Sequence, residues 1–316
     1  MGKNVLVVDT SEFRDAITSA LGSSGYRVTV TDSAFDAISK LRAYDFDLIV
    51  SEVELPGDNA FDLYDYINHH YPYIPTIMTT GKNIDEFFDR IFKEGIGNVL
   101  RKPLKHDELI KLADKLITKK DIFGLENYLP GLRELKKIRI TSSLQIQRAI
   151  ELILQQITDW GSMIDNRMIL NLVLNEMTIN AVYHSHGLTR EKERRIPVKL
   201  KEGQFVEIFF GCGEGSYGIS INDYNGKLTK ARILDSINSV VAQDQLLAHA
   251  AATGENISDR ISETGRGIDL VRKLCGEYYF IIKKNVRTEI IILFDADIQE
   301  RDTTLSSLKI IEDFSD

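Results

Sequence analysis

The stretch Leu170–Gly187 reads LNLVLNEMTINAVYHSHG and decides how the second half of the chain folds. Its apolar residues recur every three or four positions, which predicts a helix with one face in a hydrophobic core. Gly187 is suited to end this helix, and Ser162 or Asp165 to begin it. The apolar positions that carry the pattern are Leu170, Val173, Leu174, Met177 and Ala181.

Polar residues interrupt the apolar run along one edge of the predicted helix. Glu176, Asn180 and His184 are spaced four apart and so lie on one face. Burial of a carboxylate and an amide is costly unless something binds them. One interpretation is that this edge faces a nucleotide, with Asn180 holding Mg²⁺ and Glu176 orienting a water or hydroxyl nucleophile. The alternative is that the polar edge faces solvent or caps a neighbouring element.

The composition is that of an ordinary globular chain with an acidic balance. Its 316 residues favour roughly two domains. A net charge of −8 and a pI near 5.4 argue against a nucleic-acid-binding surface, which needs a basic stripe. Cys212 and Cys275 lack the spacing of a disulfide framework or zinc site and predict inert thiols. With no apolar run of membrane-spanning length and a strand-like N-terminus, we expect a cytoplasmic protein.

Residues 1–120 alternate between short apolar strands and helices. This alternation predicts five strand–helix units, that is, a parallel, doubly wound sheet with helices on both faces. In such α/β sheets the site lies at the carboxyl ends of the strands. The residues expected there are Asp9, Thr10, Glu52, Thr80 and Lys102.

This first region resembles a response-regulator receiver domain. The segments that carry the resemblance are VLVVDTSEFR, DLIVSEVELPG, IMTTGK and NVLRKPL, which begin at residues 5, 47, 77 and 98. Asp9, Thr80 and Lys102 match the family's pattern. Glu52 stands where the family has its phosphoacceptor aspartate, and Thr10 replaces the second residue of its acidic pair. Val99 replaces the switch aromatic on the last strand.

These departures predict a receiver that has lost its chemistry. Mg²⁺ requires several hard oxygen ligands in near-octahedral geometry, so Thr10 and the longer Glu52 should weaken the metal site severely. We hypothesise a pseudo-receiver that accepts no phosphoryl group, in which a Glu52–Lys102 ion pair imitates the contact of an aspartyl phosphate. The alternative is an ion pair that only supports the fold. The resemblance also implies a possible homodimer through a face that would include Phe87, Phe88, Ile91 and Phe92.

Residues 121–135 form a predicted connector, and residues 299–316 form a predicted tail. The connector mixes charged and large apolar residues, unlike a flexible tether, and we expect it to dock against one or both domains. A passive linker with a few buried side chains is the alternative. The tail is polar and charged, so we expect it to fray, with Leu308–Ile311 docking as a short helix.

Residues 136–298 predict an α+β domain, with helices on one face of a mixed, largely antiparallel sheet. An amphipathic helix is expected before the Glu176 helix, and a long polar helical region after it. The expected strands and helices are 137–143, 144–160, Ile196–Leu200, Phe205–Phe210, Tyr217–Ile221, Leu228–Ser262, Ile268–Leu274, Tyr278–Ile282 and Thr288–Leu293.

Three separated segments of this domain together resemble the gyrase/histidine-kinase/MutL-type (Bergerat) ATP-binding fold, a two-layer α+β architecture. They are NEMTINAVYH, ISINDYNG and GRGIDLVRKL, which resemble the family's N-box, DxGxG box and GxGxG box. The domain order and short length are most similar to the anti-sigma-factor serine kinases. Asn225, Lys227 and the NVRTE turn depart from the family's glycine pattern, and each lost glycine removes backbone freedom to approach a ligand.

The resemblance implies a role for each matching residue. Asn180 would bind Mg²⁺, and Glu176 would act as the catalytic residue that positions a serine hydroxyl. Asp223 would read the adenine amino group. The remaining nucleotide-binding positions are Gly226, Gly265, Gly267 and Thr288, of which Gly265 and Gly267 would present N–H groups to phosphates. Leu228–Ser262 would form the lid over the ATP.

The two resemblances imply a bacterial signal-transduction protein. Its degenerate receiver would regulate an ATP-binding, serine-kinase-like domain with ATP and Mg²⁺ as cofactors. That domain would phosphorylate or sequester a protein partner, such as an anti-sigma antagonist, a sigma factor or another signalling protein. The alternative is a non-catalytic scaffold or anti-factor that docks without ATP turnover. Neither a nucleic acid nor a membrane is expected as a partner.

Overall fold

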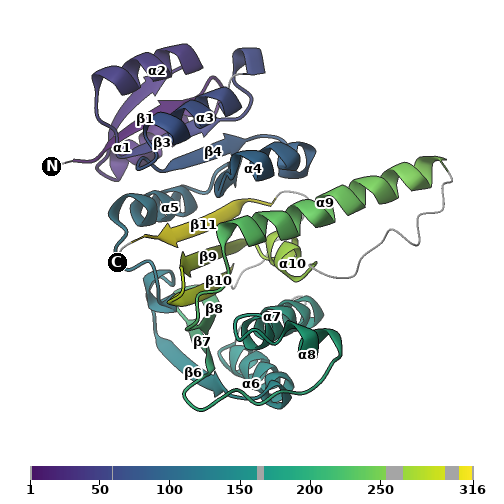
Figure 1. Ribbon diagram of the computed structural model, residues 1–316. Coiled ribbons are helices and arrows are strands. Elements are labelled where there is room, and N and C mark those ends of the chain that lie inside the picture. Colours follow the sequence, from purple (N-terminus) through teal and green to yellow (C-terminus); the bar gives the residue numbers. More distant parts are fainter. Residues whose placement is uncertain (1, 59, 162–166, 254–265, 296–305, 315–316) are drawn as a thin grey trace. The chain divides into compact units, whose positions relative to one another are not determined.

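The computed structural model describes residues 2–58, 60–161, 167–253, 266–295 and 306–314. Two units divide the chain: residues 1–120 with 304–309, and residues 121–303 with 310–316. Figure 1 shows the helices and strands of both, with the labels used below.

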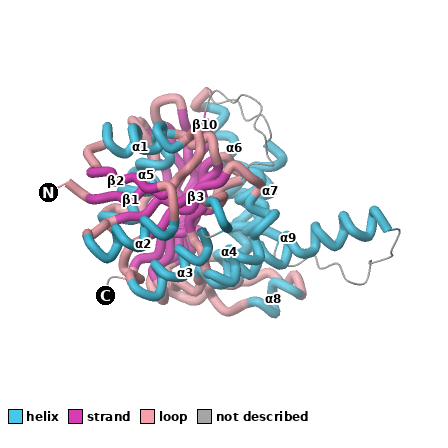
Figure 2. Tube along the Cα trace, turned by 90° about the horizontal axis from the view of Figure 1, so that it is seen from above, coloured by secondary structure: helices cyan, strands magenta, loops and turns pink. Residues whose placement is uncertain are grey.

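A parallel sheet with strand order β2-β1-β3-β4-β5 organises the first unit. Figure 2 shows α1 and α5 on one side of it and α2, α3 and α4 on the other. Because helices cover both faces, Val5–Val8 are fully buried and read as one continuous apolar run. The elements are β1 (Asn4–Val8), α1 (Arg14–Ser23), β2 (Arg27–Thr31), α2 (Ala34–Ala43), β3 (Leu48–Glu52), α3 (Ala60–His70), β4 (Thr76–Thr80), α4 (Phe88–Glu94), β5 (Asn98–Arg101) and α5 (His106–Thr118).

The outer edge of β5 is paired with residues from the end of the chain. In β11 (Leu308–Asp313), Leu308 and Lys309 lie antiparallel to Val99 and Asn98. Lys309 is buried and forms an ion pair with Glu108 of α5. On the predicted homodimer face Phe88 and Ile91 are core residues, whereas Phe87 and Phe92 are half-buried. The homodimer stays a prediction.

The predicted behaviour of the tail is wrong where the structure describes it. Leu308–Asp313 is a strand, neither frayed nor a short helix. Leu308, Ile310 and Ile311 are all buried, and consecutive buried residues suit a strand covered on both faces. A one-turn helix would turn part of this run toward solvent. Residues 299–305 and 315–316 lie outside the described residues.

A mainly antiparallel sheet organises the second unit. Its strand order is β6-β7-β8-β10-β9, and Ile310–Asp313 of β11 adds a parallel partner to β9. Figure 1 shows α6, α7 and α10 on one side of this sheet. The mixed sheet with helices on one face agrees with the predicted layout. The elements are β6 (Glu134–Ile140), α6 (Ile146–Asp159), α7 (Arg167–Tyr183), α8 (Thr189–Glu193), β7 (Val206–Cys212), β8 (Ser216–Asp223), α9 (Lys230–Thr253), α10 (Arg266–Leu274), β9 (Glu277–Lys283) and β10 (Arg287–Asp295).

One predicted strand of this unit is absent from the described residues. Ile196–Leu200 makes only an isolated bridge, between Lys199 and Ser142, and the short helix α8 precedes it. Pro197 has no N–H to donate to a strand ladder, which explains the failed prediction. The starts predicted for α7, Ser162 and Asp165, lie outside the described residues. The helix ends at Tyr183, and Gly187, with φ +74°, closes the following turn.

The predicted connector packs as part of the second unit. Ile122, Leu125, Tyr128 and Leu129 are buried. The Gly124 N–H donates a hydrogen bond to the Glu289 side chain at 2.8 Å. The next strand, expected from residue 137, begins at Glu134. Residues 121–135 are therefore an ordered edge of this unit.

Candidate functional site

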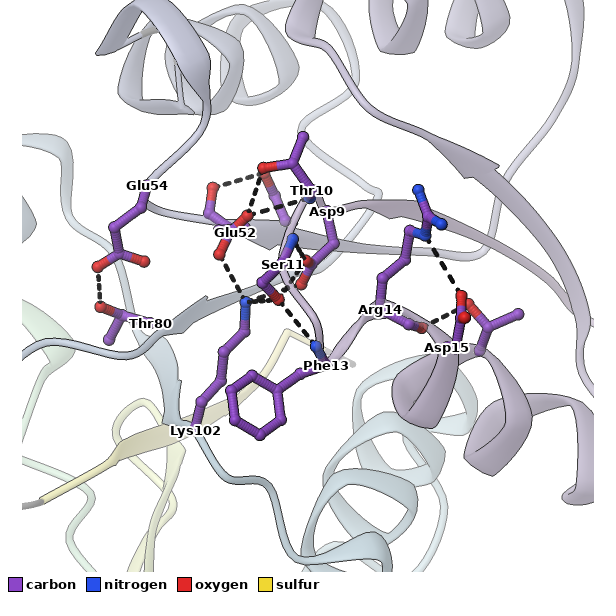
Figure 3. A network of polar contacts seen from close by, with 12 residues as sticks. Asp9, Thr10, Ser11, Phe13, Arg14, Asp15, Glu52, Glu54, Thr80 and Lys102 are labelled. Carbon is purple, nitrogen blue, oxygen red and sulfur yellow. Dashed lines mark hydrogen bonds and ion pairs between the residues drawn. The ribbon is translucent and has the colours of Figure 1, made fainter.

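A buried lysine joins two carboxylates at the carboxyl ends of the strands in the first unit (Figure 3). Asp9 follows β1, Glu52 ends β3, and Lys102 follows β5. Lys102 Nζ lies 2.8 Å from Asp9 Oδ2 and 2.8 Å from Glu52 Oε1. All three residues are at most 5% exposed. The ion pair expected between Glu52 and Lys102 is thus present, and Asp9 shares it.

Hydroxyl and backbone N–H groups complete the two carboxylates. Glu52 Oε2 accepts hydrogen bonds from the Thr10 N–H and the Thr10 hydroxyl, both at 3.1 Å. Asp9 Oδ1 accepts from the Ser11 N–H and the Ser11 hydroxyl, both at 2.6 Å. Lys102 Nζ also donates to Ser11 Oγ at 2.8 Å. Sequence reasoning missed Ser11, although an aspartate in a turn commonly accepts a hydrogen bond from the backbone N–H two residues further on.

Thr80, the fifth predicted pocket residue, has a different partner. Its buried hydroxyl donates to the carboxylate of Glu54 and accepts from the Lys82 N–H at 3.0 Å. Figure 3 shows this pair beside the Lys102 cluster. The sequence reasoning did not include Glu54. Its position two residues after Glu52, where a strand has just ended, is the signal that could have identified it.

The electrostatics of the cluster favour ionised carboxylates. Burial by itself raises the pKa of Glu52, but the hydrogen bonds from Lys102 and Thr10 outweigh it and hold the pKa below its ordinary value. Each oxygen of Asp9 and Glu52 already has a partner within the protein. A Mg²⁺ ion, which needs several oxygen ligands, does not fit this arrangement. Among the described residues, no group of three or more His, Cys, Asp or Glu residues is placed to hold a metal.

In the second unit, a lysine contacts the polar edge of α7. Lys192 Nζ of α8 donates to Asn180 Oδ1 at 2.7 Å and lies 3.3 Å from His184 Nε2. Burial lowers the pKa of Lys192, while the charge of Glu176 partly opposes this effect. Asn180 and Glu176 are half-buried. Sequence reasoning did not identify Lys192, and the only signal is that it follows the turn at Gly187.

Helix α10 brings a predicted phosphate-binding glycine to the same edge. A Cβ atom on Gly267 would lie 3.0 Å from the Met177 side chain, 3.2 Å from Asn180 Nδ2 and 3.3 Å from Glu176 Cβ. The missing side chain thus allows close packing of α10 against α7. Gly265, the other predicted glycine, lies outside the described residues, as do 254–262 of the predicted lid.

Asp223 and Thr288 lie side by side on neighbouring strands of the sheet. They are register partners on β8 and β10, and both are buried. Burial raises the pKa of Asp223, although its Oδ1 accepts from the N–H groups of Asn225 and Gly226, each at 3.0 Å. The buried Thr288 hydroxyl makes no hydrogen bond of good geometry to any described residue. Gly226, with φ +55°, packs against the backbone of the β9–β10 turn, where a Cβ would lie 2.4 Å from the Lys283 carbonyl.

The predicted nucleotide-site residues therefore form two groups. Glu176, Asn180 and Gly267 meet where α7 contacts α10, and Asp223, Gly226 and Thr288 meet at the ends of β8 and β10. Helix α7 contacts both β8 and α10.

The first unit has the α/β architecture of a receiver and an acidic pocket closed by a lysine. Residues 5–114 match the family model of the response regulator receiver domain. This part of the chain is a receiver domain of the two-component signalling type, as its sequence resemblance implied.

Comparison with known proteins places these similarities in part of the chain. It is 30% identical over 117 residues to the DNA-binding transcriptional regulator NtrC of Rhizobium meliloti (strain 1021), covering 37% of this chain and 24% of that protein. It is 28% identical over 111 residues to the response regulator protein FleR of Pseudomonas aeruginosa, covering 35% and 24%. The chain thus spans about a quarter of the length of these relatives.

Among solved structures, the signal receiver domain of an HD domain-containing protein from Pseudomonas fluorescens Pf-5 is 26% identical. That match covers 38% of this chain and 96% of the other, with a TM-score of 0.35. Within the described ranges, no helix combines the length and apolarity needed to cross a membrane.

Proposed function

We propose that this chain is a signalling protein in which a receiver domain that accepts no phosphoryl group is joined to a nucleotide-binding unit that acts on a protein partner. Its partner would be an anti-sigma antagonist, a sigma factor or another signalling protein. The observation that carries the first part is the position of Lys102 between Asp9 and Glu52 at 2.8 Å from each. An internal cation satisfies the two carboxylates that a metal ion would need.

Incubation with a small phosphodonor and Mg²⁺ tests this part. We expect no acid-labile phosphate on the wild-type receiver, because the oxygens of Glu52 are committed to Lys102 and Thr10. The double variant Thr10→Asp/Glu52→Asp restores an acidic pair and a phosphoacceptor aspartate, and it should gain acid-labile phosphate. Stoichiometric phosphate on the wild-type protein would contradict the proposal.

The nucleotide-binding part rests on the contacts of α7. This helix lies against the strand that carries Asp223 and against α10, which carries Gly267. The buried Thr288 hydroxyl and Asp223 carboxylate lie side by side, and this pair supports a ligand with hydrogen-bonding groups, such as an adenine ring. These residues fit a nucleotide base. The serine-kinase activity and the roles of Glu176 and Gly265 remain part of the proposal.

Thermal unfolding followed by the fluorescence of Trp160 tests nucleotide binding, because the chain has 1 tryptophan and it lies in the second unit. ADP or ATP at a hundred times its Kd should stabilise this unit by about 2.7 kcal/mol. Asp223→Asn should abolish the stabilisation, and Asp159→Asn, an exposed aspartate at the end of α6, should not. No stabilisation of the wild-type protein would refute nucleotide binding.

A second function is favoured by one specific contact. Lys192 already donates to Asn180 Oδ1, the oxygen that the resemblance assigns to Mg²⁺. Two cations cannot share one amide oxygen without strong repulsion. The donor set therefore does not fit a bound Mg²⁺ here. This arrangement favours a protein that docks onto its partner without ATP turnover, and nucleotide bound without measurable turnover would support this second function.

A further inference from the structure

We propose that the nucleotide site of the second unit uses the ammonium group of Lys192 as its resident cation and holds phosphate groups without a metal ion. This inference rests on the proposed nucleotide-binding function and adds how the phosphates are held. It concerns a residue on α8 that lies outside all three sequence segments that resemble the Bergerat ATP-binding motifs.

The orientation of the Asn180 amide is the first argument. An ammonium group can only donate hydrogen bonds, so the atom 2.7 Å from Lys192 Nζ is the amide oxygen. The amide nitrogen then faces Gly267 of α10. Because both ends of the amide have a neighbour, the oxygen is held toward Lys192.

The hydrogen-bonding capacity of Lys192 is the second argument. Its ammonium has three N–H donors, of which the described contacts direct one to Asn180 and one to His184 Nε2. The His184 ring therefore accepts at Nε2 and directs its Nδ1 toward the Thr189 hydroxyl, 3.1 Å away. Among the described residues none accepts the third donor of Lys192, which could therefore bond an oxygen of a ligand.

The local charge is the third argument. Burial lowers the pKa of His184, and the positive charges of Lys192 and Arg232 lower it further. Two cations, one on α8 and one on α9, therefore act on the His184 ring. Two carboxylates act in the opposite direction: the charge of Glu193 raises the pKa of His184, and the charge of Glu176 raises that of Lys192. The half-buried Lys192 ammonium itself attracts an anion such as a phosphate and repels a divalent cation.

Calorimetric titration of the full chain with ADP, in EDTA and in Mg²⁺, tests the inference. The wild-type Kd should be the same within about threefold in the two buffers. Lys192→Met should weaken ADP binding in EDTA by about tenfold to a hundredfold, the range expected for one hydrogen bond to a charged group. Lys192→Arg, which keeps the charge, should bind in EDTA, and Lys201→Met, an exposed lysine before β7, should match the wild type.

Each result separates the two ideas. If wild-type ADP binding needs Mg²⁺ and Lys192→Met binds like the wild type, the nucleotide site stands and the role of Lys192 is refuted. If ADP does not bind in either buffer, the proposed nucleotide-binding function fails and the inference fails with it. Trp160 fluorescence during thermal unfolding verifies that each variant is folded. If Lys192→Met does not fold, Lys192→Arg still tests the proposal, because it must bind ADP in EDTA.

Discussion

Replacement of the buried Lys102 by methionine should strongly destabilise the receiver domain. The variant keeps the length of the side chain but removes the charge that lies 2.8 Å from each of two carboxylates. Asp9 and Glu52, 1% and 5% exposed, would then be buried without a counter-ion. Removal of one partner of a buried ion pair costs about 3–5 kcal/mol. The Thr10 and Ser11 hydrogen bonds remain, which favours the lower end of that range.

Hydrogen exchange of the full chain measures this loss separately for each unit. Peptides from β1 and β3 report the receiver domain, and Trp160 fluorescence reports the second unit. We expect protection of the β1 and β3 amides to fall by the predicted free energy. Because the removed charge lies in the first unit, the urea transition of Trp160 should change much less.

Two further variants make the result specific to the charge cluster. Lys82→Met removes an exposed lysine near the same pocket and should leave the β1 and β3 protection unchanged. Adding Glu52→Gln to Lys102→Met removes one of the two uncompensated charges and should restore part of the lost stability. A loss under about 1 kcal/mol for Lys102→Met, or no recovery in the double variant, would refute the view that Lys102 neutralises the pocket.

Three other predictions follow from the buried polar groups. The pKa of Glu52 is held below its ordinary value, so the free energy of unfolding of the receiver should be constant above about pH 4.5 and fall as the pH drops through the lowered pKa. Glu52→Gln should remove this part of the acid sensitivity, as measured by hydrogen exchange. Burial raises the pKa of Glu289, so the free energy of unfolding of the second unit should decrease as the pH rises from about 4.5 toward that raised value. Glu289→Gln should flatten this slope in urea titrations. An unchanged slope would contradict the raised pKa of Glu289. Tyr128→Phe removes the hydrogen bond to the Ile122 carbonyl and should cost about 1–2 kcal/mol in the same titrations, whereas a passive linker would show no loss.

Helices and strands whose burial follows a local period could be predicted from the amino-acid sequence. In α6, the buried positions Ile146, Ile150, Ile153 and Ile157 follow the helical spacing seen in the sequence. In the first unit, Asp9 follows one apolar strand and Glu52 ends another. The carboxyl ends of parallel strands meet at one edge of the sheet, so the two carboxylates were expected there. Both predictions depend on local patterns of apolar and polar residues along the chain.

Contacts between groups far apart in the sequence could be found only from the folded structure. Leu308 pairs with Val99, and the apolar run around Leu308 carries no local sign that its partner is a strand of the receiver. Lys192 reaches Asn180 because the chain turns back at Gly187, and the three-dimensional path of a turn is not encoded in hydrophobic periodicity. Polar contacts such as these are set by distances of a few ångströms between side chains, whereas a sequence pattern reports only which face of an element is buried.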